Sequence, residues 1–521
     1  MKQIVQRKLA QRKRRIITRL EMALRQDGEQ PTLKPANIVY ELGERTRAIS
    51  HGGIGIVMLL CQLLRLPQRI DSGLHLLKFH RPYYESDHVL NLAFNPLCGG
   101  QTLDDIELRR NDEVYLDALG TESIPDPTTA GDFCRRFSAC DIHALMTAIN
   151  ETRLEVWRMQ PSSFTEQTAR IDADGILVST QGECKEGMDI SHKGSWGYHP
   201  LVVSLANTQE PLFITNRGGN RPSHEGVVPL FDKAVDLCRK AGFADILLRG
   251  DTDFSLTSEL DRWDADGVRF VFGYDAAPNL KTRADGHPEA QYEELVRHAE
   301  REIKTKPRRK QPRVKEDIVR ERLYRNIRLD SEDIAEIEYQ PTRCNKAYRM
   351  VVVRKNLSLM RGEWVLFPDV RYFFYITNDR ELSPREVVNE AMQRCNQENL
   401  NAQLKGGVRA LHAPFNTLNA NWAYMVTTAL AWSIKAWLAL MLPVHGRWRE
   451  KHTTERETLL KMEFRTFVQA MMAVPAQIIM AGRRTIFRLL AWSPWQPVFF
   501  RLVDALRCCN VAASSQSSTR W

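Results

Sequence analysis

Short apolar runs bounded by polar turn residues recur between residues 166 and 274, and they predict a mixed α/β segment. A helix is expected near Glu225–Ala241, and strands are expected at 169–173, Tyr198–Leu205, Leu212–Thr215, Asp245–Leu248 and Val268–Gly273. Tight turns join the first strands and a helix joins the later ones. That order of connections is typical of a mixed sheet.

The N-terminal flank, residues 1–165, follows a helical period, with apolar runs at 53–66 and 143–157. Either Asp126 or Thr128 is the predicted N-cap of a helix that ends near residue 137, after a Pro-containing turn. A helix-turn-helix that docks DNA and a purely structural helical hairpin fit this stretch equally well.

The C-terminal flank, residues 446–521, is basic and is predicted to be helical, including the stretch 481–493. Arg483, Arg484 and Arg488 in that stretch either bind DNA or form a solvated helix face. The polar residues from 512 onward have the composition of a disordered tail.

Carboxylates stand at the ends of two of the predicted strands. Asp172 and Asp174 are two residues apart and therefore share one strand face. Asp251 and Asp253 follow the buried strand that includes Asp245–Leu248. Acids at strand ends often serve as caps or solvate loops, so each pair alone is a weak signal.

A helix is predicted over Ser383–Lys405, with Ser383 as its cap and Glu386 completing a capping box. Arg394, Glu398 and Lys405 would lie on one stripe of this helix at 100° per residue. The stripe is either a solvated charged face or a metal-binding acid beside cations that hold nucleic-acid phosphates.

Taken in order, Asp, Asp and then Arg-x3-Glu-x6-Lys suit phosphodiester chemistry on DNA, which uses two divalent ions held by oxygen ligands. The chain here resembles bacterial insertion-sequence transposases with an RNase H-like DDE catalytic core. It is most similar to the cut-and-paste group that carries the Y-x2-R-x3-E-x6-K signature. The stretches 124–137, 192–208 and 216–231 fit this family too.

The resemblance implies that Asp174, Asp251 and Glu398 are the catalytic acids and hold two Mg2+ or Mn2+ ions. It implies that Arg394 and Lys405 bind DNA. Ala391 stands where the signature has Tyr, which puts the phosphate contact of that Tyr in doubt. The activity implied is metal-dependent strand cleavage at the element ends, followed by strand transfer into target DNA.

The expected fold is α/β, with an RNase H-like mixed-sheet catalytic core, a β-rich insertion, and helical N-terminal and C-terminal regions. The expected domains are a helical DNA-binding region at 1–165, the core at 166–275 and 369–445, the insertion at 276–368, and the C-terminal region at 446–521. The insertion begins with a basic, Pro-broken run at 301–315, which is expected to contact DNA.

Composition agrees with a partner that is a polyanion. The 521 residues include 73 Lys and Arg against 64 Asp and Glu, a formal net charge of +9. The ten cysteines contain no C-x2-C pair, so neither a zinc ribbon nor a disulfide framework is indicated, and adjacent Cys508 and Cys509 are expected to pack. The scattered single cysteines and the absence of a signal peptide pattern fit a reducing cytoplasm, and the resemblance implies a bacterial, nucleoid-associated location.

The apolar run Trp422–Leu442 is long enough to raise the question of a membrane, but its Lys435 and hydroxyl side chains favour a buried core helix. His192, His199 and His224 have no metal-ligand spacing. The expected partners are double-stranded DNA, as terminal inverted repeats and target, and a second copy of the chain. The alternatives are a catalytically inactive or repurposed DNA-binding protein and a related metal-dependent nuclease.

Overall fold

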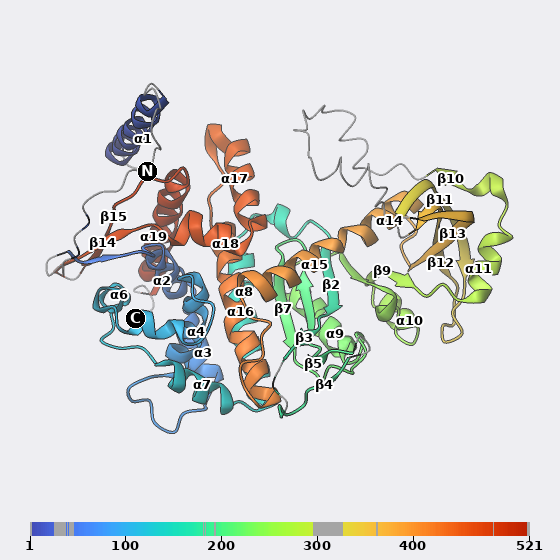
Figure 1. The fold of residues 1–521 in the computed structure, drawn as a ribbon, viewed down its shortest axis with the longest axis horizontal. Helices are drawn as coiled ribbons and strands as arrows, with labels where there is room; N and C mark the ends of the chain where they lie inside the picture. Colours follow the sequence, from blue (N-terminus) through green and yellow to red (C-terminus); the bar gives the residue numbers. More distant parts are fainter. Residues whose placement is uncertain are drawn as a thin grey trace.

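The computed structural model describes residues 3–24, 38, 40, 46–180, 182, 184–191, 194–294, 327–360, 363–482 and 484–517. The basic run 301–315, His192 and Arg483 lie outside these residues, so the roles expected of them stay predictions. Figure 1 shows the two terminal regions side by side at one end of the molecule and the outermost strands of the central sheet at the other.

A nine-stranded mixed sheet organises the centre of the chain, in the order β10-β11-β12-β13-β9-β8-β2-β6-β7. β8 pairs in parallel with β2 and β9, and all other neighbours are antiparallel. The strands are β2 (Ala169–Gly175), β6 (Leu201–Leu205), β7 (Glu210–Thr215), β8 (Ile246–Gly250), β9 (Arg269–Tyr274), β10 (Glu293–Glu294), β11 (Ile327–Tyr339), β12 (Tyr348–Met360) and β13 (Glu363–Thr377). The mixed sheet confirms the predicted fold class, and the β-rich insertion continues this sheet.

Alternate residues of the central strands face opposite layers of helices, as the two-residue period requires. Leu247 and Val271 pack with Val387 of α14 (Pro384–Gln393). Phe272 points the other way, where its ring lies 6.2 Å from that of Phe231 in α9 (Val227–Ala241). The odd-numbered residues of β8 therefore face α14. The same alternation sets the direction of the side chains at the polar, carboxyl end of the strand.

Helices make up most of the N-terminal region, as predicted. They are α1 (Gln3–Leu24), α2 (Ile54–Leu63), α3 (Leu66–Gly73), α4 (Glu85–Leu97), α5 (Asp105–Arg110), α6 (Glu113–Leu119), α7 (Pro127–Arg135) and α8 (Ala139–Arg158). Asp126, not Thr128, caps α7, because its Oδ1 accepts a hydrogen bond from the Thr129 amide at 2.9 Å. Whether α7 docks DNA stays a prediction.

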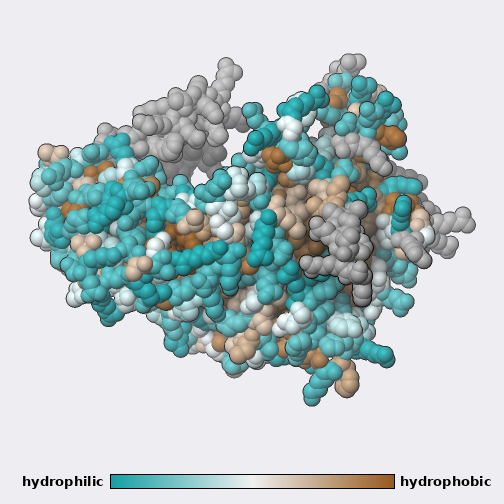
Figure 2. All heavy atoms as spheres, turned by 180° about the vertical axis from the view of Figure 1, so that it is seen from behind, coloured by the Kyte–Doolittle hydropathy of each residue, from teal (hydrophilic) through white to brown (hydrophobic). Residues whose placement is uncertain are grey.

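Helix α16 (Leu418–Leu440) runs between the N-terminal helices and the sheet (Figure 1). Among the described residues it is the one helix with the length and apolar composition to cross a membrane, and it is buried along its length inside the protein. Figure 2, in contrast, shows a mainly hydrophilic surface over the rear face of the molecule. The helix contacts α4, α7, α8 and β7, so it forms the core between the N-terminal helices and the sheet.

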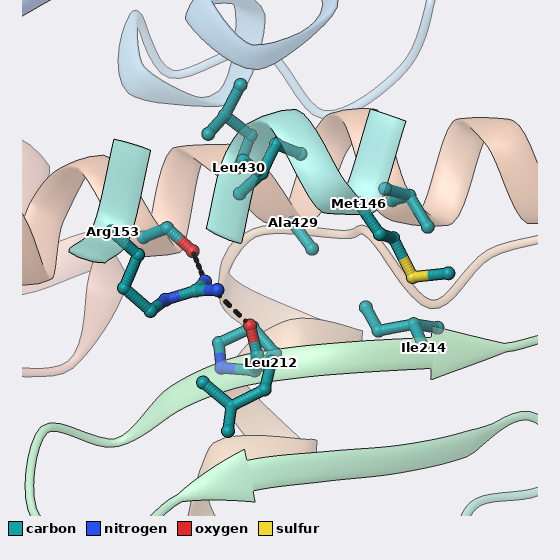
Figure 3. A pocket seen from close by; sticks show the side chains of 10 residues that line it. Met146, Arg153, Leu212, Ile214, Ala429 and Leu430 are labelled. Carbon is teal, nitrogen blue, oxygen red and sulfur yellow. Dashed lines mark hydrogen bonds between the residues drawn. The ribbon is translucent and has the colours of Figure 1, made fainter. Parts of the chain in front are cut away.

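A buried polar cluster ties α8, β7 and α16 together. Both carboxylate oxygens of Glu210 accept hydrogen bonds, from Arg153 at 2.9 Å, from Trp157 at 3.0 Å and from Trp437 at 2.7 Å. Figure 3 shows Arg153 also donating to the Pro211 carbonyl and to Ser433, beside a cavity of about 20 Å³. Such a cavity has room for one water molecule.

The buried side chain of Lys435 in α16 predicts how the stability of the protein depends on pH. Its ammonium is buried, donates to the Leu460 carbonyl at 2.8 Å and lies 3.9 Å from the centre of the Trp432 ring. Burial lowers the pKa of Lys435 to about 7. Because the unfolded chain keeps this proton up to a pKa of 10.5, the free energy of unfolding should rise above about pH 7, by at most ~1.4 kcal/mol per pH unit.

Urea titrations of wild type and Lys435→Met across this pH range measure the effect. The Met side chain has a similar length and no charge to bury, so the variant should be the more stable protein below pH 7 and should lose this rise. Equal pH slopes in the two proteins would contradict the assignment.

The structure corrects the predicted strand Tyr198–Leu205. β5 (Trp196–Tyr198) and β6 belong to different sheets, because Pro200 lies between them and has no amide hydrogen to donate. β5 forms a small separate sheet with β3 (Val178–Ser179) and β4 (Asp189–Ile190).

The helix predicted at 481–493 is wrong. The segment contains the turn, with Gly482 at φ +59°, and the second strand of a hairpin formed by β14 (Ala476–Ala481) and β15 (Arg484–Leu489). β14 also pairs with β1 (Ala48–Ile49). Exposed and less exposed residues alternate along β15, a strand pattern that the basic residues obscure in the sequence.

The remaining C-terminal elements are helical. They are α17 (Arg449–Lys461), α18 (Phe464–Phe467), the π-helical turn η6 (Val468–Met472) and α19 (Gln496–Ser517). α19 includes residues 512–517 of the predicted disordered tail, so that prediction is wrong for this part, and 518–521 lie outside the described residues.

Candidate active site

Two of the three predicted acids lie at the same edge of the sheet. Asp174 is the second-last residue of β2, and Asp251 directly follows β8. Because β2 and β8 are parallel neighbours, their carboxyl ends meet at this edge. Glu398 comes from α15 (Cys395–Ala402), which packs on β2. The fold therefore carries Asp174, Asp251 and Glu398 to one region on the α14–α15 side of the sheet.

The segment that carries Glu398 is not the single α-helix predicted over Ser383–Lys405. Its start is as expected, because Ser383 Oγ accepts from the Glu386 amide and the Glu386 carboxylate accepts from the Ser383 amide at 2.8 Å. The helix then breaks at Arg394, between α14 and α15, and becomes π-helical at η4 (Gln403–Gly407). The regular spacing of 100° per residue, on which the predicted common stripe of Arg394, Glu398 and Lys405 depends, therefore does not hold along the whole segment.

The three carboxylates act on one another electrostatically. Burial raises the pKa of Asp174 to about 6, and the negative charges of Asp251 and Glu398 add to this effect while Arg394 opposes it. Burial also raises the pKa of Asp251, again against the influence of Arg394. A half-buried carboxylate beside two others is a site where a cation binds favourably.

Arg394 stands where the helix breaks, with its guanidinium facing the acids. Its Nη1 lies 3.9 Å from Asp251 Oδ2, and its side chain is 19% exposed. The positive charge lowers the pKa of Asp172, Asp174 and Asp251, each of which burial raises. Arg394 therefore neutralises part of the charge of this carboxylate cluster.

Three polar residues that the sequence analysis did not single out hold α15 against the sheet. Asn401 Nδ2 donates to Asp174 Oδ2 at 2.8 Å. Gln397 Nε2 donates to Asn401 Oδ1 and to the Val202 carbonyl, both at 3.4 Å, and Ser204 Oγ donates to Gln397. The signal in the sequence is a Gln and an Asn four residues apart on either side of Glu398. Their inward direction depends on the sheet beneath them.

Asp172 belongs to a buried ion-pair network. Arg249 donates to both of its carboxylate oxygens, at 2.7 and 2.9 Å, and also to Glu390 Oε2 at 3.0 Å. Glu390 accepts from Arg170 as well, at 2.6 Å. These residues lie on β2, β8 and α14, the elements that position the three acids. Asp172 is therefore fully engaged in holding the sheet and α14 together.

Asp253 has a local role that the structure makes visible. It lies in a single 3-10 turn, Thr252–Phe254, and its amide donates to Asp251 Oδ1 at 3.1 Å. Asp251 thus caps its own turn, which orients its carboxylate. The side chain of Asp253 is exposed.

Gly175 explains why a small residue follows Asp174. A Cβ at this position would lie 2.7 Å from His199 Nε2, on the face of β2 opposite the acids. His199 Nδ1 is 2.8 Å from the Arg221 carbonyl, which can only accept, so Nδ1 carries the hydrogen. His199 supports the tip of β2 from beneath.

Lys405 lies in η4 and is exposed. Its Nζ donates to the Leu177 carbonyl at 3.1 Å, just beyond the end of β2, and its own carbonyl lies 3.0 Å from His412 Nε2. The ammonium is therefore held at the same edge of the sheet as the acids.

The carboxylate oxygens of Asp174, Asp251 and Glu398, with the side-chain amide of Asn401 beside them, are the kind of ligands that a hard divalent cation prefers. Within the part of the chain that the structure describes, no three His, Cys, Asp or Glu side chains lie close enough together to coordinate one ion. Arg394, which faces Asp251, supplies positive charge in this geometry. Glu398 is exposed.

Comparison with curated proteins gives no match. Among solved structures, a cryo-EM structure of the piggyBac transposase synaptic complex with hairpin DNA aligns with 82% of this chain and 81% of its own, at 10% identity. Its TM-score of 0.34 is too low to establish a shared fold. The family described as transposase DDE domain group 1 matches residues 42–511, which is most of the chain. The chain belongs to the transposase DDE domain group 1 family.

Proposed function

We propose that this chain is the transposase of a bacterial insertion sequence, in the cut-and-paste group with the Y-R-E-K signature. It cleaves DNA strands at the ends of the element and joins the freed 3′-OH to target DNA. The observation that supports this most directly is the meeting of Asp174, Asp251 and the Glu398 helix at the carboxyl edge of the sheet.

In this proposal Asp174, Asp251 and Glu398 hold two Mg2+ or Mn2+ ions. When bound, the ions supply activation of the attacking oxygen and stabilisation of the leaving oxygen. Asn401 fixes the orientation of the Asp174 carboxylate through its hydrogen bond. Arg394, whose Nη1 lies 3.9 Å from Asp251 Oδ2, would bind a phosphate near the cut, as the signature implies.

The partners proposed are double-stranded DNA and a second copy of the chain, because two ends must be cut in concert. The proposed location is the bacterial cytoplasm, at the nucleoid. The proposed domains are those given above, with the core interrupted by the insertion.

Cleavage of a DNA fragment that carries the end of the element tests this function. The purified protein should cut it in Mg2+ or Mn2+ and leave it intact in EDTA, because carboxylates alone cannot stabilise the leaving oxygen. End-specific binding without cleavage at any metal concentration would favour a catalytically inactive DNA-binding protein. Equal cleavage of DNA with and without the element's end would favour a nuclease.

Lys405 tests the DNA contact beside the acids. If its ammonium binds a phosphate, Lys405→Ala should make the slope of log affinity against log salt shallower by about one unit. If the ammonium only stabilises the C-terminal end of the helix and donates to the Leu177 carbonyl, Lys405→Ala should lower the melting temperature slightly. The slope of log affinity against log salt should then stay unchanged.

A matched control is Lys461→Ala, since Lys461 is also exposed in the last turn of a helix, α17. Arg394→Ala should shift the salt slope in the same direction as Lys405→Ala. Identical slopes for wild type and both active-site variants would remove the phosphate-binding role from these two residues.

A further inference from the structure

The N-terminal helix α1 is only lightly attached to the rest of the protein. Of its residues Gln3–Met22, only Leu9 is buried, against a groove of about 420 Å³ whose lining includes Trp492 and Pro494. Arg12 donates to the carbonyls of Leu489 and Ala491, at 3.1 and 3.4 Å. Figure 1 shows the helix at the margin of the molecule, above the β14–β15 hairpin.

The charge on α1 is strongly one-sided. Against one acid, Glu21, the helix has seven basic residues: Arg7, Lys8, Arg12, Lys13, Arg14, Arg15 and Arg19. All of them are exposed except Arg12, which is half-buried. No acid stands in the first turn and no base in the last, so the charges do not serve the helix dipole.

Four of these cations form a single stripe. Lys8, Arg12, Arg15 and Arg19 follow the spacing i, i+4, i+7 and i+11, which keeps them within about 60° on one face and spreads them over about 16 Å. Like charges at this spacing repel and destabilise the helix unless counter-charges lie opposite. Among the described residues, the structure gives Lys8, Arg15 and Arg19 no ion-pair partner.

Two candidate partners of the exposed face of α1 differ in charge, and charge complementarity decides between them. The same helix exposes Ile16, Ile17 and Leu20, so a second copy of α1 is one candidate. Such pairing would place two strongly positive helices against each other. A row of phosphates instead offers evenly spaced negative charges along the whole stripe.

We propose that α1 is an arm that binds the DNA backbone, with the exposed Lys8, Arg15 and Arg19 of the stripe laid along phosphates without reading sequence. This rests on the proposed function, because it takes DNA as the substrate. Leu9 and Arg12 anchor the arm on the C-terminal hairpin region, so DNA held there reaches the protein at its end remote from the insertion.

The test compares two double variants of the full chain on a duplex of arbitrary sequence. Arg15→Gln/Arg19→Gln removes two charges from the stripe. Lys233→Gln/Lys240→Gln removes two exposed charges from α9, on the sheet face opposite the acids. Gln keeps helix propensity in both. The α1 variant should have a salt slope shallower by about two units, and the α9 variant should match wild type.

Arg15→Lys/Arg19→Lys, which keeps the charges, should retain the wild-type slope. Equal slopes for the α1 and α9 variants would overturn the arm while leaving DNA binding by the protein intact. Absence of DNA binding by the wild type would overturn the proposed function as well. Loss of dimer mass, or of binding to anionic vesicles, in the α1 variant with its DNA slope unchanged would assign the helix to a second copy or to a lipid surface instead.

Discussion

Replacing Glu398 with Gln is expected to lower metal-dependent strand cleavage by several orders of magnitude while leaving binding to the element's end in place. The amide keeps the shape of the side chain but removes a ligand charge that the two metal ions require. Asp174→Asn and Asp251→Asn should behave in the same way. Cleavage of a labelled end fragment and a gel-shift titration on the same fragment measure the two effects separately.

Asp253→Asn is the matched control for the acids. Asp253 lies two residues from Asp251 and is exposed; its amide donates to Asp251 Oδ1, and its charge adds to the effect of burial, which raises the pKa of Asp251. Its variant should cleave at nearly the wild-type rate. Thermal unfolding checks that the variants are folded, since Asp174→Asn removes a half-buried charge from a cluster of three acids and should not destabilise the fold. Cleavage by Glu398→Gln at the wild-type rate would contradict the assignment of the site.

Arg249→Met is expected to reduce the free energy of unfolding by about 3 to 5 kcal/mol, because it leaves Asp172 buried without a counter-charge. Asp172 and Arg249 are 0% and 1% exposed, so water cannot replace the lost partner. Glu390 loses one of its two cations as well. The loss should be read from urea titrations, with the slope of unfolding free energy against urea checked for constancy.

Two further variants make this result specific. Arg239→Met breaks an exposed pair with Asp266 and should cost less than about 1 kcal/mol. The double variant Asp172→Asn/Arg249→Met removes the stranded charge and should recover a large part of the stability. If Arg249→Met were no more destabilising than Arg239→Met, the network would not be what joins β2, β8 and α14.

Much of the catalytic region follows from local sequence. The strand β2, which includes Asp174, the strand β8, which precedes Asp251, the helix α9 and the capping box at Ser383 lie close to where the sequence predicts them. Each depends on side chains only a few residues apart, through a two-residue or 3.6-residue period or through a cap that bonds three residues on. The catalytic roles of Asp174, Asp251 and Glu398 stay predictions until the variants are measured.

Only the tertiary structure decided which side chains meet across the sheet. Asp172 and Asp174 look alike in the sequence, yet one is bound by Arg249 from β8 and the other accepts from Asn401 on α15. Arg394 also has a partner far away in sequence, because its Nη1 lies 3.9 Å from Oδ2 of Asp251 at the end of another strand. No local pattern encodes such pairings.

The C-terminal hairpin shows the same limit most clearly. The segment from Ala476 to Leu489 is a pair of strands where the basic residues suggested a helix, and its first strand pairs with Ala48–Ile49 from the other end of the chain. The sequence by itself determined the local periods, the caps and the positions of the acids, because these depend on neighbours along the chain. Tertiary structure alone decided the strand partners and the buried ion pairs, because their free energy comes from groups far apart in sequence.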